Sequence, residues 1–238
     1  YKIRMKPAHT PTAKIETQWN KLFLFGGIAG LAMLGIMVAQ IAIFIIWPPP
    51  ETVLDFFALF QKSWLLGLLS MDLLYLINNA VLILIYLALF MALKHTHPSA
   101  MLIALVLGLV GIAAYYASNT AFEMLRLSQF YAEAADETQK AVFLGAGEAM
   151  LAIYKGTAFD VYYVLNGIML LITAAVMLKS ELFSRATAIW GLAAGVLMSI
   201  PSTAGTIGLI FSLASLVPWA VFLALVVRRF FKLAKLGS

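Results

Sequence analysis

The chain has 238 residues, of which 63% are hydrophobic and only 11% are charged, and its mean hydropathy is +0.96. A soluble domain is usually about 45–50% apolar and about 25% charged, so a water-soluble core of this size cannot hide all these side chains. The composition excludes a soluble enzyme, a disordered chain and a nucleic-acid-binding domain, and it predicts an all-α integral membrane protein that crosses the bilayer several times.

Six stretches of the chain have the length and apolarity of membrane-crossing helices, each of which needs about 20 residues. In chain order they are residues 22–47, 64–93, 99–121, 156–178, 186–200 and 207–227. Three consecutive prolines, 48–50, close the first stretch, and Pro201 ends the short fifth one. Pro218 lies inside the sixth stretch and predicts a kink there, because proline removes a helical hydrogen bond. The transmembrane bundle is therefore expected over residues 22–231.

The distribution of the basic residues predicts the orientation of these spans. Twelve of the 16 lysines and arginines lie in the two tails, residues 1–21 and 232–238, or at span ends on the same side as the tails. Because cytoplasmic loops are enriched in Lys and Arg, we expect both termini to be cytoplasmic, in the inner (cell) membrane. The basic tails are expected to contact anionic lipids at that face, which also accounts for the net charge of +5 without nucleic acid.

Two segments on the outer side are predicted to be helical without crossing the membrane. Thr52–Gln61 mixes aromatic, aliphatic and acidic residues and is typical of a short helix that lies in the interface. Residues 122–155 form a longer outer segment, in which Tyr131–Lys140 is rich in strong helix formers. We expect this segment to be an interfacial amphipathic helix that leads into the fourth span. The alternative is that its apolar part, residues 142–154, forms a seventh span.

An internal repeat occurs in the second and fourth spans. The pattern Asp-x-x-Tyr-x-x-Asn is found at Asp72, Tyr75 and Asn78 and again at Asp160, Tyr163 and Asn166. Residues three apart are neighbours on one face of a helix, so each copy forms a polar stripe, which Asn79 and Tyr86 extend in the second span. An Asp at membrane depth is costly unless it faces protein or water. The two stripes are therefore expected to face each other or a shared cavity, with Asp72 and Asp160 at similar depth.

The candidate ligand-binding residues are the carboxylates, cations, tyrosines and amides near these stripes. They are Asp72, Tyr75, Asn78, Asn79, Glu123, Arg126, Glu148, Asp160, Tyr163 and Asn166. Together they predict an outward-opening polar pocket between the second and fourth spans that binds or moves a small cationic or amphipathic ligand. Tyrosine hydroxyls would donate hydrogen bonds, and tyrosine rings would attract a cation. The alternative is that Asp72 and Asp160 only hydrogen-bond neighbouring helices, paired with Arg126 or Lys155.

Two other classes of function stay open on the sequence. In the first, the chain is a structural or accessory subunit of a larger membrane complex, or a homo-oligomer, and its apolar Phe, Met and Gly faces dock other subunits. In the second, it is a membrane-embedded enzyme that uses Glu148, Asp72 and Asp160 as acid and base, although no nucleophile pair is visible and no catalytic residue is assigned. No cofactor or metal is expected, because the chain has no cysteine and its three histidines lie outside the spans.

Three parts of the sequence resemble a known family of bacterial membrane proteins. They are the Ala-rich segment Tyr131–Lys140, the pair Gly147–Glu148, and the stretch Leu178–Gly195, which reads LKSELFSRATAIWGLAAG. These features are similar to those of the six-helix family known as domain of unknown function 4386, mainly over the second half of the chain. The resemblance implies six membrane helices. Since the family has no established activity, it implies no functional residue.

Overall fold

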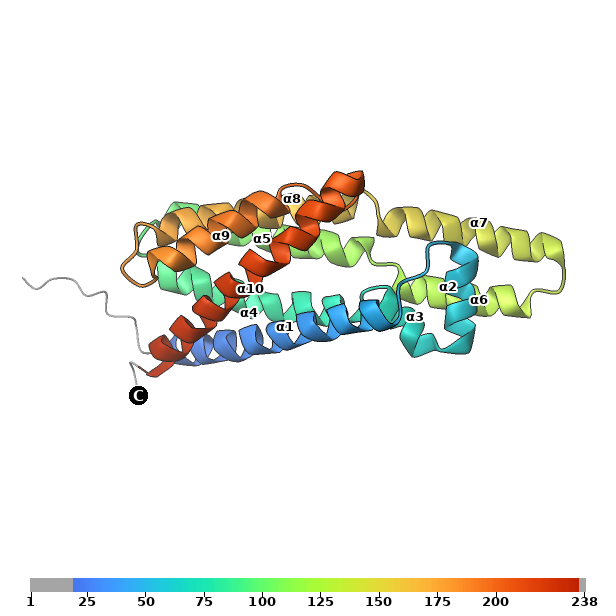
Figure 1. Cartoon of the computed structure of the whole chain (residues 1–238), viewed down its shortest axis with the longest axis horizontal. Coiled ribbons are helices and arrows are strands. Elements are labelled where there is room, and N and C mark those ends of the chain that lie inside the picture. The colour runs from blue at the N-terminus through green and yellow to red at the C-terminus, as the bar shows by residue number, and fades with distance from the viewer. Residues whose placement is uncertain (1–18, 236–238) are drawn as a thin grey trace, which may run out of the picture.

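The computed structural model describes residues 19–235, which form ten α-helices and no strand. The helices are α1 (Asn20–Ile46), α2 (Val53–Lys62), α3 (Trp64–Ser70), α4 (Leu73–Leu93), α5 (Pro98–Ser118), α6 (Ala121–Glu133), α7 (Glu137–Tyr154), α8 (Thr157–Met177), α9 (Arg185–Met198) and α10 (Gly205–Lys235). Figure 1 shows an elongated molecule in which α1, α4, α5, α8, α9 and α10 run along the long axis, while α2, α3, α6 and α7 gather at one end. The predicted all-α class is confirmed for this part of the chain.

The six long-axis helices form a ring. Each packs against its neighbours in the order α1, α4, α5, α8, α9, α10, and α10 closes the ring by packing on α1. Successive helices of the ring alternate in direction, so α4 and α8 run the same way and both begin at the end that carries α2 and α3 (Figure 1). We call this end the outer end. The two copies of the repeated motif are therefore found at equivalent ends of two parallel helices.

Five helical segments are long and apolar enough to cross a membrane, by length and composition. They are Asn20–Ile46, Leu73–Leu93, Pro98–Glu133, Glu137–Met177 and Gly205–Lys235, in the part of the chain that the structure describes. The fifth predicted span corresponds to α9, an apolar helix of only 14 residues. Helices α7 and α8 together form one of these segments, Glu137–Met177. Pro218, where a kink is predicted, does not interrupt the last helix, because α10 is continuous through it.

The second predicted span is not one helix, which corrects the expectation for residues 64–93. Helix α3 ends at Ser70, and α4 begins at Leu73. Between them Asp72 has a φ of 65°, and it is the only non-glycine residue with positive φ among residues 19–235. This left-handed conformation costs an ordinary residue of the order of 1–2 kcal/mol, which Asp tolerates better than most because its short side chain bonds locally. No local pattern predicts the break, because leucines flank it on both sides.

The outer segments also differ from the expected interfacial helices. Residues 122–155 form most of two antiparallel helices, α6 and α7, rather than one. Helix α2 packs against both of them and against α3. The apolar side chains of this outer unit form a second core that consists of Val53, Phe56, Phe57, Phe60, Leu68, Met71, Ala121 and Met124. Protein, not the lipid interface, therefore covers the apolar face of α2.

Glycines allow α1 and α10 to approach closely at the end of the bundle opposite the outer unit. The Cβ position of Gly27 lies 3.0 Å from the ring of Phe231, and that of Gly26 lies 3.2 Å from Phe230. A Cβ atom on Gly30 would clash with a methyl group of Val227. These glycines of the first span therefore form a helix-packing face.

The variant Gly30→Ala should separate α1 from α10 and lower the free energy of unfolding by about 1–3 kcal/mol, the usual cost of overpacking. The β-branched Val227 has little rotamer freedom with which to yield. Gly35→Ala is the matched control, because no described atom lies within 4 Å of its Cβ position. It should be neutral or stabilise α1 by up to about 1 kcal/mol. Thermal unfolding in detergent measures both, and equal melting temperatures would contradict the packing argument.

Candidate ligand-binding site

A cavity of about 360 Å³ lies inside the ring. Its wall includes side chains from α1, α4, α5, α8, α9 and α10 and from Ser202 in the α9–α10 loop. This volume falls in the lower part of the range of small-molecule sites, about 300–1,000 Å³. The cavity is therefore large enough for a ligand of modest size.

The wall of the cavity is polar toward the outer end and apolar deeper in the bundle. The polar side chains come from the first turns of α4 and α8, from the end of α5 and from the start of α10: Asp72, Tyr75, Asn78, Tyr115, Tyr162, Tyr163, Asn166 and Ser212. One to three turns further along the parallel helices α4, α8 and α10, the wall consists mainly of Leu82, Ile85, Leu89, Met169, Leu170, Trp219, Phe222 and Leu223. Tyr86 and Ser215 also lie in this part, and their hydroxyl groups donate hydrogen bonds within the protein. The shape and chemistry suit an amphipathic molecule whose polar group faces the outer end.

Asp72 contributes the only carboxylate of the cavity wall. Its side chain accepts a hydrogen bond from the hydroxyl of Tyr154, the last residue of α7. It also sits at the N-terminus of α4, where the partial positive charge of the helix favours an anion. Within residues 19–235 the ion pair is Lys140–Glu137, so no basic side chain of that region is paired with Asp72. The alternative in which Arg126 or Lys155 neutralises this carboxylate is not realised.

Asn119 holds the helix break that positions Asp72. Its amide Nδ2 donates to the Met71 carbonyl over 2.9 Å, and its Oδ1 accepts from the backbone N–H of Ala121 over 3.2 Å. One side chain thus satisfies backbone groups at two helix junctions, α3–α4 and α5–α6. Irregular backbone at membrane depth is tolerated only where such partners exist. Neither Asn119 nor Tyr154 was among the predicted site residues; a lone Asn between two helical stretches was the available signal.

Four aromatic rings gather near Asp72. The ring centroids of Tyr115 and Tyr162 are 4.9 Å apart, those of Phe159 and Tyr163 are 5.1 Å apart, and Tyr162 meets Tyr163 edge to face at 5.7 Å. Asp72 and these four aromatic side chains line the same cavity. Because the faces of aromatic rings attract cations, the cluster and the carboxylate favour the same kind of ligand.

The second copy of the motif uses its residues differently. Asp160 lies within the first turn of α8 and accepts a hydrogen bond from Thr203 in the α9–α10 loop, and it does not line the cavity. Asn166 joins the two parallel helices, because it accepts a hydrogen bond from Tyr86 of α4. Tyr163 shares a hydrogen bond of 2.8 Å with Ser212 of α10. The two stripes therefore share one cavity, but only one of the two carboxylates belongs to it.

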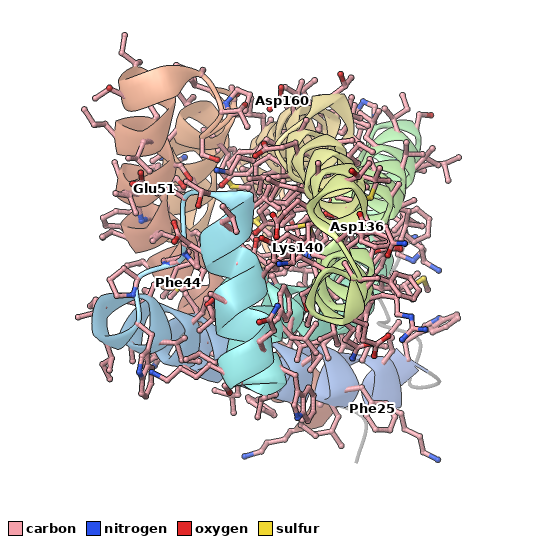
Figure 2. The ribbon with its side chains drawn as sticks, turned by 90° about the vertical axis from the view of Figure 1, so that its right-hand side faces the viewer. Phe25, Phe44, Glu51, Asp136, Lys140 and Asp160 are labelled. Carbon is pink, nitrogen blue, oxygen red and sulfur yellow. The ribbon has the colours of Figure 1, made fainter. Side chains whose placement is uncertain are left out.

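The remaining predicted site residues lie outside the cavity wall. Asn79 is fully buried and donates to the Tyr75 carbonyl over 3.0 Å. Glu123 and Arg126 are exposed on α6, and Glu148 is exposed on α7. The Arg126 guanidinium lies over an aromatic ring of its own helix, 4.1 Å from its centroid. Figure 2 views this end of the molecule and shows Asp136 and Lys140 at the α6–α7 turn, away from Asp160 at the start of α8.

Two buried polar atoms in the cavity wall have no hydrogen-bond partner among the described residues. They are Oε1 of Gln40 and the hydroxyl of Tyr115. Gln40 is 1% exposed, and its Nε2 donates to the Leu69 carbonyl over 3.3 Å. An unpaired buried polar group costs about 1–3 kcal/mol, so a ligand that bonds to these atoms gains affinity. Gln40 was not predicted, although a single Gln in an apolar span was a visible signal.

Comparison with protein families identifies one match. The model for a domain of unknown function (DUF4386) matches residues 22–231. No curated protein and no solved structure matches the chain. The match carries no assigned chemistry, so the roles of the cavity residues have to be argued from their geometry.

The variant Asn119→Ala should lower the free energy of unfolding by about 1–3 kcal/mol, because it leaves the Met71 carbonyl and the Ala121 N–H without their partner. Thermal unfolding in detergent measures the effect. Tyr116→Phe on the same helix is the control. It removes one hydrogen bond to the Leu76 carbonyl, which lies within helix α4 and keeps its backbone donor. A loss as large in the control as in Asn119→Ala would show that Asn119 has no special role at the break.

Proposed function

This chain belongs to the DUF4386 family, and from its cavity we propose that it binds a small cationic amphiphile inside the membrane. The five apolar segments of membrane-crossing length indicate a polytopic membrane protein. The proposal adds that the ammonium group of the ligand lies against Asp72 and the aromatic rings. Its apolar part extends toward the deeper, aliphatic wall.

The proposal includes six membrane crossings with both termini in the cytoplasm. The alternating directions of the six ring helices support it, since the first and last described residues then lie at the same end (Figure 1). Lys94 and Arg185 also belong to that end, as do the basic residues in the last turn of α10, Lys232 and Lys235. Positive charge marks the cytoplasmic side of inner-membrane proteins. The polar end of the cavity then faces the outer side of the membrane.

The observation that carries the proposal is the carboxylate of Asp72 in the cavity wall without a basic partner among the described residues. A carboxylate at membrane depth is expensive, and such residues usually mark ligand or ion sites. The hydrogen bond from Tyr154 occupies one oxygen, Oδ2. A hydrogen bond between helices therefore uses only one of the two carboxylate oxygens of Asp72, and a bound cation would contact the carboxylate through the other.

A primary ammonium group suits the wall better than a quaternary one. It has N–H donors for the Asp72 carboxylate and for the unpaired Gln40 Oε1 and Tyr115 hydroxyl. It also retains the attraction to the faces of Tyr162 and Tyr163. The deeper leucine, methionine and phenylalanine side chains offer no polar partner, so they suit a hydrocarbon group.

The test uses the full chain in a neutral detergent and phenethylammonium as the probe, followed by isothermal titration calorimetry. Saturable binding is expected, and Asp72→Asn should weaken it at least about tenfold, which corresponds to about 1.4 kcal/mol. Asp160→Asn makes the same charge change outside the cavity and should stay within twofold of the wild type. The uncharged analogue 2-phenylethanol should bind the wild type no more tightly than phenethylammonium binds Asp72→Asn.

The melting temperature of each variant shows whether it is folded, and Asp72→Glu, which keeps the charge, should retain more binding than Asp72→Asn. Equal affinity of the wild type and Asp72→Asn for phenethylammonium would refute the proposed function. So would an equal loss in Asp160→Asn.

A further inference from the structure

The cavity has an opening on the side of the bundle, between α1 and α10. At one end of the bundle these helices touch through Gly26, Gly27 and Gly30, but α10 runs obliquely and moves away from α1 toward the outer end (Figure 1). Side chains from this divergent part of both helices line the cavity. From α1 they are Met37, Gln40, Ile41 and Phe44, and from α10 they are Leu209, Ser212, Leu213 and Leu216.

Several of these side chains face the cavity and the outside of the protein together. Ile41 of α1 is 38% exposed, and Leu213 and Leu209 of α10 are 58% and 51% exposed, yet all three belong to the cavity wall. The wall on the opposite side of the ring is closed, since Tyr115 of α5 and Met169 and Leu170 of α8 are buried. The cavity therefore reaches the surface between α1 and α10.

The surface around this opening is hydrocarbon. On α1 it includes the exposed Ile45 and Ile46, and on α10 the exposed Ile207 and Ile210. Helix α1 has no charged residue after Lys21, and α10 has none before Arg228. Figure 2 shows Phe44, a cavity residue, on the side of α1 near α10, and Phe25 on the outward side of α1. In a bilayer such a surface faces acyl chains, so the opening leads into the lipid and not into water.

The position of Gln40 adds a polar atom to the α1 side of this opening. Its Oε1 is buried, lacks a partner among the described residues and belongs to the cavity wall, and its chain neighbour Ile41 forms the rim. The polar head group of a ligand that passes the rim therefore reaches the Gln40 acceptor before the hydrocarbon chain of that ligand enters the cavity. Unpaired acceptors of this kind are rare in buried positions and call for a partner.

We propose that the ligand is a long-chain primary amine that dissolves in the membrane and enters sideways between α1 and α10. Its ammonium group binds inside the cavity, and its alkyl chain lies in the opening between Ile41 and Leu213. This inference rests on the proposed function, because it uses the same cation site, and it specifies the ligand class and the route. A cavity of about 360 Å³ holds the head group and part of a chain, so the opening receives the remainder.

The test blocks the opening chemically in the full chain. The sequence has no cysteine, so Leu213→Cys can be labelled with a bulky maleimide at one position only. Ile210→Cys is the matched control, because Ile210 is on the same helix and equally exposed, at 59%, but is not part of the cavity wall. Binding of tritiated dodecylammonium is measured in phosphatidylcholine nanodiscs above the amount taken up by empty nanodiscs. Phenethylammonium, which lacks the long chain, is measured in parallel.

Labelled Leu213→Cys should bind dodecylammonium at least tenfold more weakly than the wild type, and its affinity for phenethylammonium, which has no long chain to place in the opening, should fall by a clearly smaller factor. Labelled Ile210→Cys should change neither affinity. Labelled Ile41→Cys, from the opposite rim, should repeat the selective loss, which covers the case that one labelled variant fails to fold. The lateral route is overturned if both rim labels leave the affinity for dodecylammonium unchanged. It is also overturned if the labels weaken the binding of both probes equally. If the wild type binds neither probe, or binds both without Asp72, the proposed function itself is wrong.

Discussion

The break between α3 and α4 leaves polar groups that need hydrogen-bond partners from the surrounding structure. In a hydrocarbon environment every backbone polar group needs a partner within the protein, and a carboxylate needs a counter-charge or hydrogen bonds. Asn119 supplies the partner for the Met71 carbonyl, and Tyr154 supplies a donor for Asp72. Both come from the junctions where α5 leads into α6 and α7 leads into α8. The outer unit is therefore tied to the cavity by two side chains at its base.

This arrangement explains why the outer unit has a core of its own. Helix α2 buries phenylalanines against α6 and α7, and Gly147 lets Val53 and Phe57 approach closely. A rigid outer unit fixes the positions of Asn119 and Tyr154, and through them the left-handed conformation of Asp72. Sparsely populated backbone conformations persist where neighbouring structure over-determines them, and they cluster at binding sites. The contacts that hold the backbone of Asp72 in this conformation therefore also place its side chain in the cavity wall.

Helices α1 and α10 touch at one end of the ring and diverge toward the other, and side-chain size accounts for both. Small residues let α1 and α10 approach at the end opposite the outer unit, where Phe230 and Val227 fill the contact. Toward the outer end the facing residues are larger, and α10 leans away, so a space remains between the helices. Lipid is as apolar as the side chains there, so no hydrophobic force closes that space. The divergence of α1 and α10, and with it the exposure of cavity-lining residues on both helices, follows from ordinary helix packing.

The sequence by itself determined the class of the protein, its family and most of its spans. These follow from the excess of apolar residues and from the length that a bilayer imposes on a helix, both of which are properties of local composition. It also identified Asp72, Tyr75, Asn78, Tyr163 and Asn166, five of the residues that line the cavity. The repeated motif was a sufficient signal for these, because residues three apart share a helix face in any helix.

Only the tertiary structure decided which copy of the motif faces the cavity with its carboxylate. Asp72 precedes α4, whereas Asp160 lies inside α8 and turns to Thr203, and identical spacing cannot encode that difference. Residues 64–93 are long enough and apolar enough for one continuous span, so the break depended on Asn119, which is 48 positions away from Met71 in sequence. The partners of Gln40 and the burial of α2 are likewise long-range contacts. Local periodicity reports which face of a helix is polar, but the neighbouring helices decide what that face meets.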